Sequence, residues 1–203
     1  MNNKNKGFTL VELIVVLVIL AILAAILVPA LLGYIDRAKE SQDMLKARNM
    51  LQASQAVLVD YYGKGKPVPE ENPTTNCNTD FAKAVRKLAD DDPYLTIIGV
   101  GTNEEYKPGY GEALHDQYTV YFVAYWEKKD KPPLFFDGTD WSMDYPWGSQ
   151  TGRDHNYFDM KGKRINVSFV IVANKDGKEA WTHLGEAVTK FGHSKGSNDN
   201  RKK

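Results

Sequence analysis

The sequence predicts an α+β fold in which a long N-terminal helix packs on an antiparallel β-sheet. An unbroken apolar run opens the chain, and a helical spacing of apolar residues continues it to about residue 62. Three segments rich in β-branched and aromatic residues follow further on, with alternating side chains. A helix that carries an apolar stripe needs a cover, and these segments can form a sheet to supply it.

The apolar run covers residues 8–32, and Glu12 is its only charged residue. About 20 apolar residues suffice to cross a bilayer. Lys4 and Lys6 precede the run, so the positive-inside rule places the N-terminus in the cytoplasm and the chain from Gly33 onward outside. A secretory signal would have a shorter apolar stretch and a small-residue cleavage site, and the sequence shows neither. We therefore expect a single-pass anchor in the cytoplasmic membrane.

The first 40 residues or so resemble the N-terminal region of type IV pilin precursors. An aliphatic run that reaches Pro29 follows the start of the motif. The start of the motif consists of Lys6, Gly7, Phe8, Thr9, Leu10, Val11, Glu12 and Leu13.

This resemblance implies a pilin-like fold and a leader peptide of residues 1–7. It implies that a prepilin peptidase cuts between Gly7 and Phe8 and N-methylates Phe8. It also implies a homo-oligomeric helical filament at the cell surface, built by a platform protein and an assembly ATPase from subunits held in the membrane. No counterpart of the resemblance is found beyond about Lys46.

Glu12 is the residue to which the resemblance gives an assembly role. In the family, this glutamate pairs with the terminal amine of a neighbouring subunit, which here is the amine of Phe8. A buried charge is tolerable when it is partnered and costly when it is not, so Glu12 would favour a correctly registered subunit. The alternative is a glutamate near the end of a span that reaches to the interface.

Pro29 lies inside the apolar helix, where it removes a backbone hydrogen bond, and Gly33 follows about one turn later. The resemblance implies that this region can melt when subunits enter the filament. A simple kink, or the end of the span, is the other interpretation.

Residues 33–62 are predicted to continue the helix as its soluble half, and the Gly-Lys-Gly-Lys-Pro stretch at 63–67 ends it. Residues 63–191 form the expected α+β head, and residues 192–203 the expected flexible tail. The apolar stripe of the soluble half is predicted to contain Met44, Ala47, Leu51, Ser54, Leu58 and Tyr61.

In the head, Thr79 or Asp80 is expected to cap a short helix with Phe81, Val85 and Leu88 on one face. Strands are expected at 95–101, 117–127 and 164–175, and a short strand running into a helix at 179–192. The second strand is expected to place its even-numbered residues 118–126 on one face. Its other face is apolar enough to need a second cover.

Aromatic and acidic residues alternate in the loop region 134–163. Such loops suit an adhesive or glycan-binding surface, but they also make subunit contacts or cover a sheet. Calcium is an alternative, although the aspartate spacing matches no EF-hand. The candidate adhesive residues are Trp141, Tyr145, Trp147 and Tyr157.

The composition points away from several classes of function. With 26 basic and 26 acidic residues, the chain has no charge excess that would attract nucleic acid. Cys77 is the only cysteine, so no intramolecular disulfide can form. The four histidines lack a metal-binding spacing, and the aspartates at 90–92 fit a solvated helix end better than a metal site. We therefore expect no metal, no cofactor and no enzymatic activity.

Three hypotheses follow in order of preference. The first is the structural subunit of a type IV pilus. The second is a pseudopilin of a type II secretion or DNA-uptake system, which would share the same anchor. The third is a membrane-anchored enzyme or receptor.

Overall fold

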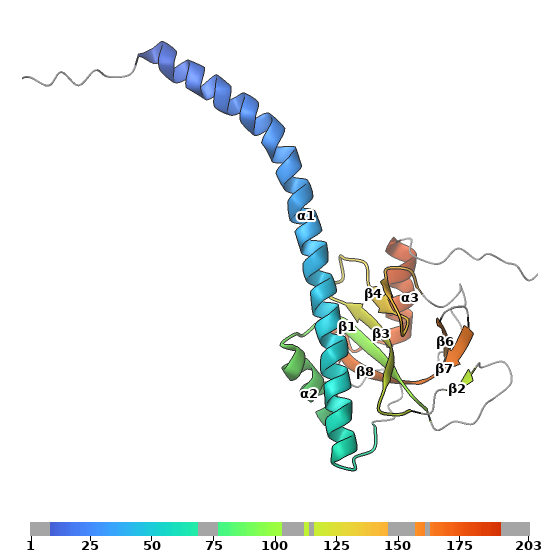
Figure 1. Ribbon diagram of the computed structural model, residues 1–203. Helices are drawn as coiled ribbons and strands as arrows, with labels where there is room; N and C mark the ends of the chain where they lie inside the picture. The colour runs from blue at the N-terminus through green and yellow to red at the C-terminus, as the bar shows by residue number, and fades with distance from the viewer. Residues whose placement is uncertain are drawn as a thin grey trace, which may run out of the picture. The chain divides into compact units, whose positions relative to one another are not determined.

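The computed structural model describes residues 9–68, 77–102, 112–113, 116–145, 157–160 and 163–191 (Figure 1). The chain divides into two compact units, Met1–Asp43 and Met44–Lys203. Helix α1, Leu10–Gly63, begins in the first unit and ends in the second. It continues past residue 32 and ends at Gly63, as the sequence predicted, although Pro29 lies inside it. The predicted leader at 1–7 and tail at 192–203 lie outside the described residues.

The second unit contains a five-stranded sheet in the order β5-β4-β3-β1-β8, in which all paired neighbours are antiparallel. This confirms the predicted α+β class. The strands are β1 Leu95–Val100, β3 Val120–Trp126, β4 Leu134–Phe136, β5 Trp141–Ser142 and β8 Ser168–Asn174.

A three-stranded sheet in the order β2-β7-β6 accompanies it. The strand predicted at 164–175 is divided between the two sheets, because the pairing breaks at Val167. The strands of the smaller sheet are β2 Glu112–Ala113, β6 Tyr157–Met160 and β7 Lys163–Asn166.

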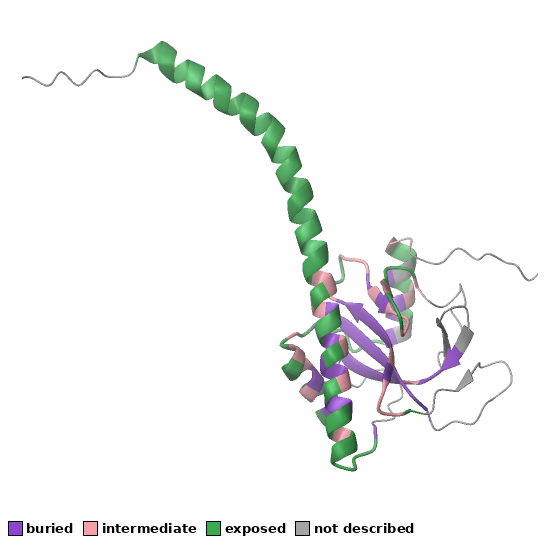
Figure 2. Ribbon diagram, in the orientation of Figure 1, coloured by how far each residue is buried: buried purple, intermediate pink, exposed green. Residues whose placement is uncertain are grey.

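Both faces of strands β1, β3 and β8 are buried (Figure 2). The head part of α1 and helix α2, Asp80–Ala89, cover one face, on which Val170 and Val172 lie. Helix α3, Ala180–Phe191, covers the other, on which Phe169 and Ile171 lie. The second cover that the sequence predicted is therefore helix α3. The short strand expected at its start is not found, since the described residues between β8 and α3 contain no strand.

The prediction that the even-numbered residues 118–126 share one face of β3 is wrong. Gly99 pairs with Phe122 and Val100 pairs with Val120, which leaves Tyr121 as an extra residue in the strand. This bulge shifts the alternation, so Val120 faces α1 and α2 whereas Phe122 faces α3. Periodicity within one strand cannot show a bulge, because the extra residue is defined only against the partner strand.

Thr79 caps α2, and its Oγ1 accepts a hydrogen bond of 3.0 Å from the backbone N–H of Ala82. Phe81 and Val85 are buried as predicted, but Leu88 is 58% exposed. The side chain of Leu88 lines a shallow groove against α1 instead of entering the core.

The head part of α1 buries a stripe close to the predicted one. Met44, Leu51 and Tyr61 of that prediction are only half-buried. The buried residues of the helix are Ala47, Met50, Ala53, Ser54, Val57 and Leu58.

Replacement of Gly101 by alanine is expected to destabilise the head by about 3 kcal/mol or more, because a Cβ there would lie 2.1 Å from the backbone oxygen of Asp116. Gly63→Ala is the matched control, since a Cβ at that position meets nothing within 4 Å. Chemical denaturation of the detergent-solubilised chain measures both. Equal stability of the two variants would contradict the close approach of residues 101 and 116.

Candidate functional site

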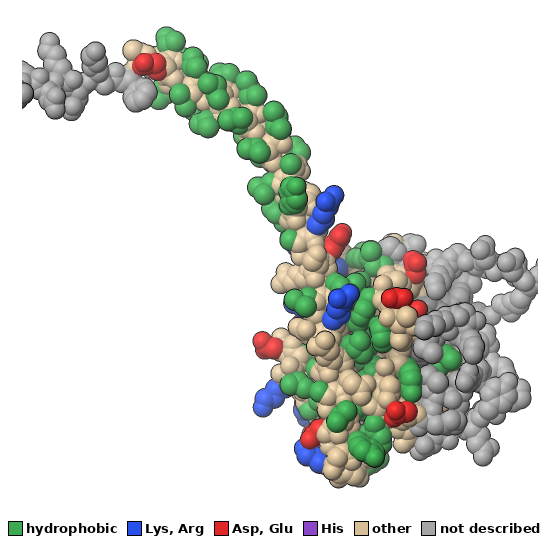
Figure 3. Space-filling view, in the orientation of Figure 1, with side chains coloured by type: hydrophobic (Ala, Val, Ile, Leu, Met, Phe, Trp, Pro, Cys, Tyr) green, Lys and Arg blue, Asp and Glu red, His purple; other side chains and the backbone are tan. Residues whose placement is uncertain are grey.

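Every residue of α1 from Leu10 to Leu32 is exposed, and Figure 3 shows hydrophobic side chains along the visible face of this segment. Its most apolar 18-residue window has a mean hydropathy of 3.3, and none of that window is buried. Among the described residues, α1 is the one helix whose length and composition suffice to cross a membrane. Large side chains such as Leu10, Ile26 and Leu27 are more than 60% exposed. Within the unit Met1–Asp43 no described residue covers this surface, and an apolar surface of this size is unfavourable in water, so we expect lipid or another molecule to cover it.

Glu12 makes its contacts within the first turn of this helix. Its Oε2 accepts hydrogen bonds of 2.8 Å from both the backbone N–H and the hydroxyl of Thr9. The backbone N–H of Glu12 donates in return to Thr9 Oγ1, at 3.3 Å. This reciprocal pattern is a capping box, which satisfies helix-terminal N–H groups that would otherwise lack partners.

The capping box changes the interpretation of Glu12. A carboxylate that accepts two hydrogen bonds from its own chain is less costly in an apolar surrounding than a bare one. Thr9 therefore reduces the free-energy cost of an unpaired Glu12 carboxylate in a lone subunit. The signal for Thr9 was present in the sequence, because Ser or Thr three residues before Glu is the capping-box spacing.

The other residues predicted from the N-terminal motif have different outcomes. Gly7 and Phe8 lie outside the described residues. Helix α1 continues through Pro29 and Gly33, and a Cβ at Gly33 would meet nothing within 4 Å. The proposed kink or melting at these two residues stays a prediction.

Comparison with known proteins identifies the motif. The family described as the prokaryotic N-terminal methylation motif matches residues 2–28. The chain is 32% identical over 114 residues to a type IV major pilin protein PilE1 of Neisseria gonorrhoeae, which covers 53% of this chain and 66% of that protein. It is 40% identical over 73 residues to another PilE1 of that organism, which covers 36% of this chain and 32% of that protein. No solved structure matches the chain.

The chain is therefore similar to type IV pilins in its N-terminal motif and over part of its length. Its long N-terminal helix and antiparallel sheet are consistent with the fold of that family. The matched span of residues 2–28 contains Gly7, Phe8, Thr9 and Glu12, so the capping box lies inside the matched motif. The alignments cover less than two thirds of either relative.

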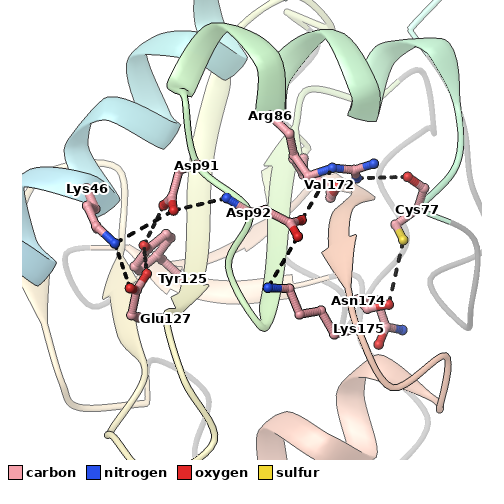
Figure 4. A network of polar contacts seen from close by, with 10 residues as sticks. All are labelled: Lys46, Cys77, Arg86, Asp91, Asp92, Tyr125, Glu127, Val172, Asn174 and Lys175. Carbon is pink, nitrogen blue, oxygen red and sulfur yellow. Dashed lines mark hydrogen bonds and ion pairs between the residues drawn. The ribbon is translucent and has the colours of Figure 1, made fainter.

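A polar network fixes the head part of α1 to the five-stranded sheet (Figure 4). Lys46 Nζ lies 2.6 Å from Glu127 Oε1 and 3.9 Å from Asp91 Oδ1. The hydroxyl of Tyr125, a residue that is 1% exposed, lies 2.6 Å from Asp91 Oδ2 and 2.5 Å from Glu127 Oε2. The network thus ties α1 to strand β3 and to the loop before β1.

The charges in this network perturb each other. Burial raises the pKa of Glu127, but the hydrogen bonds from Lys46 and Tyr125 outweigh it and hold that pKa below its ordinary value. Burial, followed by the two neighbouring carboxylates, raises the pKa of Tyr125 far above its usual range. Tyr125 therefore stays neutral and can act as a hydrogen-bond donor to either carboxylate.

The aspartates at 90–92 also hold the end of α2 in place. Asp92 lies 3.7 Å from Arg86 Nε and 3.2 Å from Lys175 Nζ. Arg86 also donates to the backbone oxygens of Cys77 and Val172, and the thiol of Cys77 lies 3.7 Å from the oxygen of Asn174 (Figure 4). Among the described side chains there is no group of three or more His, Cys, Asp or Glu that could hold a metal ion.

His183 is a buried histidine, and no motif in the sequence distinguishes it from the other three histidines. It is 6% exposed at the start of α3, with Nδ1 3.2 Å from the Tyr94 hydroxyl and Nε2 3.6 Å from Asp176 Oδ2. Tyr94 donates to Asp176, and this hydrogen bond lowers the pKa of Asp176. The cluster joins α3 to the ends of β1 and β8.

The candidate adhesive loop is described in part. Trp141 is half-buried and packs on Phe136 with ring centroids 5.4 Å apart. Tyr145 packs edge-on against Phe135, also at 5.4 Å. Trp147 lies outside the described residues, and Tyr157 is described only as part of the backbone of β6. These contacts close the edge of the sheet, and an adhesive role for the loop stays a prediction.

Replacement of Lys46 by methionine is expected to lower the free energy of unfolding at pH 7 by about 1–2 kcal/mol, because Asp91 and Glu127 then share a site without a cation. The lowered pKa of Glu127 gives the wild type stability above pH 4.5 that is lost as the pH falls through the folded value. The penalty of the variant should therefore shrink in acid, where the carboxylate of Glu127 becomes protonated.

Denaturation curves at several pH values measure this effect. Lys64→Met is the control, because its partner Asp60 at 2.6 Å is exposed and such a pair contributes little. A penalty for Lys46→Met that is equal at pH 7 and pH 4 would contradict the electrostatic origin.

Proposed function

We propose that the chain is the precursor of a structural pilin that assembles into a surface filament. In this proposal a prepilin peptidase removes Met1–Gly7 and methylates Phe8, while residues 8–32 hold the subunit in the cytoplasmic membrane with its N-terminus inside. An assembly ATPase and a platform protein then transfer the subunit into a helical homopolymer. The lysines at positions 4 and 6 before the apolar run support this orientation.

The observation that carries the proposal is the uncovered apolar surface of α1 within a matched methylation motif. A hydrophobic signal that is discarded after export would explain the apolar composition but not a motif that retains it in the mature chain. Burial of large aliphatic side chains contributes about 1.5–3 kcal/mol each against water, which explains why a free subunit stays in lipid.

Apolar burial alone does not drive the step from membrane to filament. Lipid tails and a core of packed helices are similar surroundings for leucine and isoleucine, so their exchange changes the free energy little. Energy from the assembly machinery and the pairing of Glu12 with the amine of a neighbouring Phe8 are the terms left to favour the filament.

The pilus is favoured over a pseudopilin by the relatives, since both carry the name of major pilins. Electron microscopy of sheared cell-surface material, labelled with an antibody to this chain, tests the proposal directly. Long labelled filaments are expected, and labelled material that starts well beyond Leu32 would contradict it.

Replacement of Gly7 by valine is expected to leave only the full-length, unmethylated chain, because the peptidase needs a residue without a side chain before the cut. Intact-mass spectrometry of the membrane fraction measures the outcome. Gly33→Ala, which places a methyl group in open space, should be trimmed and methylated normally. Normal trimming of Gly7→Val would contradict the proposed junction.

Replacement of Glu12 by alanine is expected to leave trimming intact but to reduce sheared filaments by roughly ten-fold or more, since the charge pair is lost. Glu12→Gln should behave similarly, because it keeps the size and removes the charge. Glu40→Ala, an exposed glutamate on the same helix, is the control. Abundant filaments from Glu12→Ala would remove the pairing role and leave the trimming result standing.

A further inference from the structure

A shallow groove runs between α1 and α2 in the head. It has a volume of about 300 Å³ and is lined by Asn49, Gln52, Ala53, Ala56, Leu88 and Ala89. Leu88 is 58% exposed on one side of it, and Leu45, on the same helix as Asn49 and one turn before it, is 59% exposed. The small side chains of the three alanines leave room for an incoming side chain. The amides of Asn49 and Gln52 can donate and accept hydrogen bonds beside it. The groove therefore fits a flexible apolar side chain with polar neighbours.

The flanks of the groove are basic. Arg48, Lys87 and Asp90, each next to a lining residue, are exposed, whereas the exposed Asp92 at the end of α2 pairs with Arg86 and Lys175. Two positive charges against one negative charge give these flanks a net positive charge. An occupant with aspartates or glutamates around an apolar tip would match this pattern.

Such a tip, the Met143 corner, lies directly after β5 in the same head. Met143 is 41% exposed there, and Asp140 and Asp144 on either side of it are exposed. Residues 137–145 contain three aspartates and no lysine or arginine. Methionine is unbranched and adapts to irregular gaps, so it suits a groove with a shallow floor.

The groove and the tip belong to opposite edges of the sheet. Strand β5 is the last strand on one side of the order β5-β4-β3-β1-β8, and α2 packs along β8, the last strand on the other side (Figure 1). One head therefore cannot bring its own tip into its own groove. Two different surfaces that fit each other form a heterologous contact, and repetition of such a contact builds open helical arrays.

We propose that the Met143 corner of one subunit docks into the α1–α2 groove of the next, with Asp140 and Asp144 facing Arg48 and Lys87. The inference rests on the proposed assembly into a filament and names one contact within it. The occupant is a second copy of this chain.

A disulfide cross-link in sheared filaments tests the contact. The variant carries Leu88→Cys and Met143→Cys in a Cys77→Ser background, which removes the only native cysteine. Mild oxidation should convert most of the chain to a ladder of dimers, trimers and longer species on a non-reducing gel. Each copy offers both halves of the contact, so the ladder does not stop at the dimer.

Two controls define the outcome. Co-expression of the two single-cysteine chains should stop the ladder at the dimer, as a heterologous contact requires. Leu88→Cys combined with Lys178→Cys, an exposed residue in the turn before α3, should give no ladder. Filaments whose subunits still run as monomers on the non-reducing gel after oxidation would overturn the contact, and so would a disulfide within one chain. The proposed function would stand in both cases. Absence of filaments from the wild type would overturn the proposed function itself.

Charge reversal tests the same contact without cysteines. Lys87→Glu should reduce sheared filaments by about ten-fold, the change that 1.4 kcal/mol produces. Asp140→Lys should have a similar effect, and the double variant should recover most of the loss because the pair is restored with opposite signs. Unchanged filament yield in both single variants, or no recovery in the double variant, would contradict the pairing of these surfaces.

Discussion

The apolar surface of the first half of α1 is the constraint on which the rest of the structure depends. Its large side chains are about half exposed or more along the whole run, and no described residue of the unit Met1–Asp43 covers them. Exposure of such a surface to water is strongly unfavourable, so the segment needs an apolar environment at every stage. Both phases in the proposed cycle, membrane and filament core, meet this requirement, which is why the same segment can serve in each.

The head solves the opposite problem for the second half of α1, where the stripe is narrow and the helix must be held in water. The sheet buries that stripe from Ala47 to Leu58, and Lys46 pairs with carboxylates from β3 and from the loop before β1 at the start of it. With Cys77 as the only cysteine, no intramolecular disulfide can contribute. Burial on both faces of the sheet and a polar network at its end supply the stability instead.

The parts of the fold that could be predicted are those set by local pattern. Local sequence was enough to predict the apolar run, the N-cap at Thr79 and the strands β1, β3 and β8. The bulge at Tyr121 and the exposure of Leu88 could not be predicted, because both depend on partners that are distant in the sequence. The same holds for the functional residues. Glu12 can be predicted from the N-terminal motif, whereas the groove between α1 and α2 depends on how the two helices pack.

Thr9 connects the local structure of the helix terminus to assembly. In the free chain, the carboxylate of Glu12 accepts two hydrogen bonds from neutral donors of Thr9. A charged amine is a stronger partner than either, so exchange toward a neighbouring subunit is favourable wherever water is excluded. Before and after that exchange the carboxylate has partners, and a bare charge in hydrocarbon need never form. The capping box thus stabilises the unpaired carboxylate, and it reduces the free energy that the proposed pairing with the amine gains.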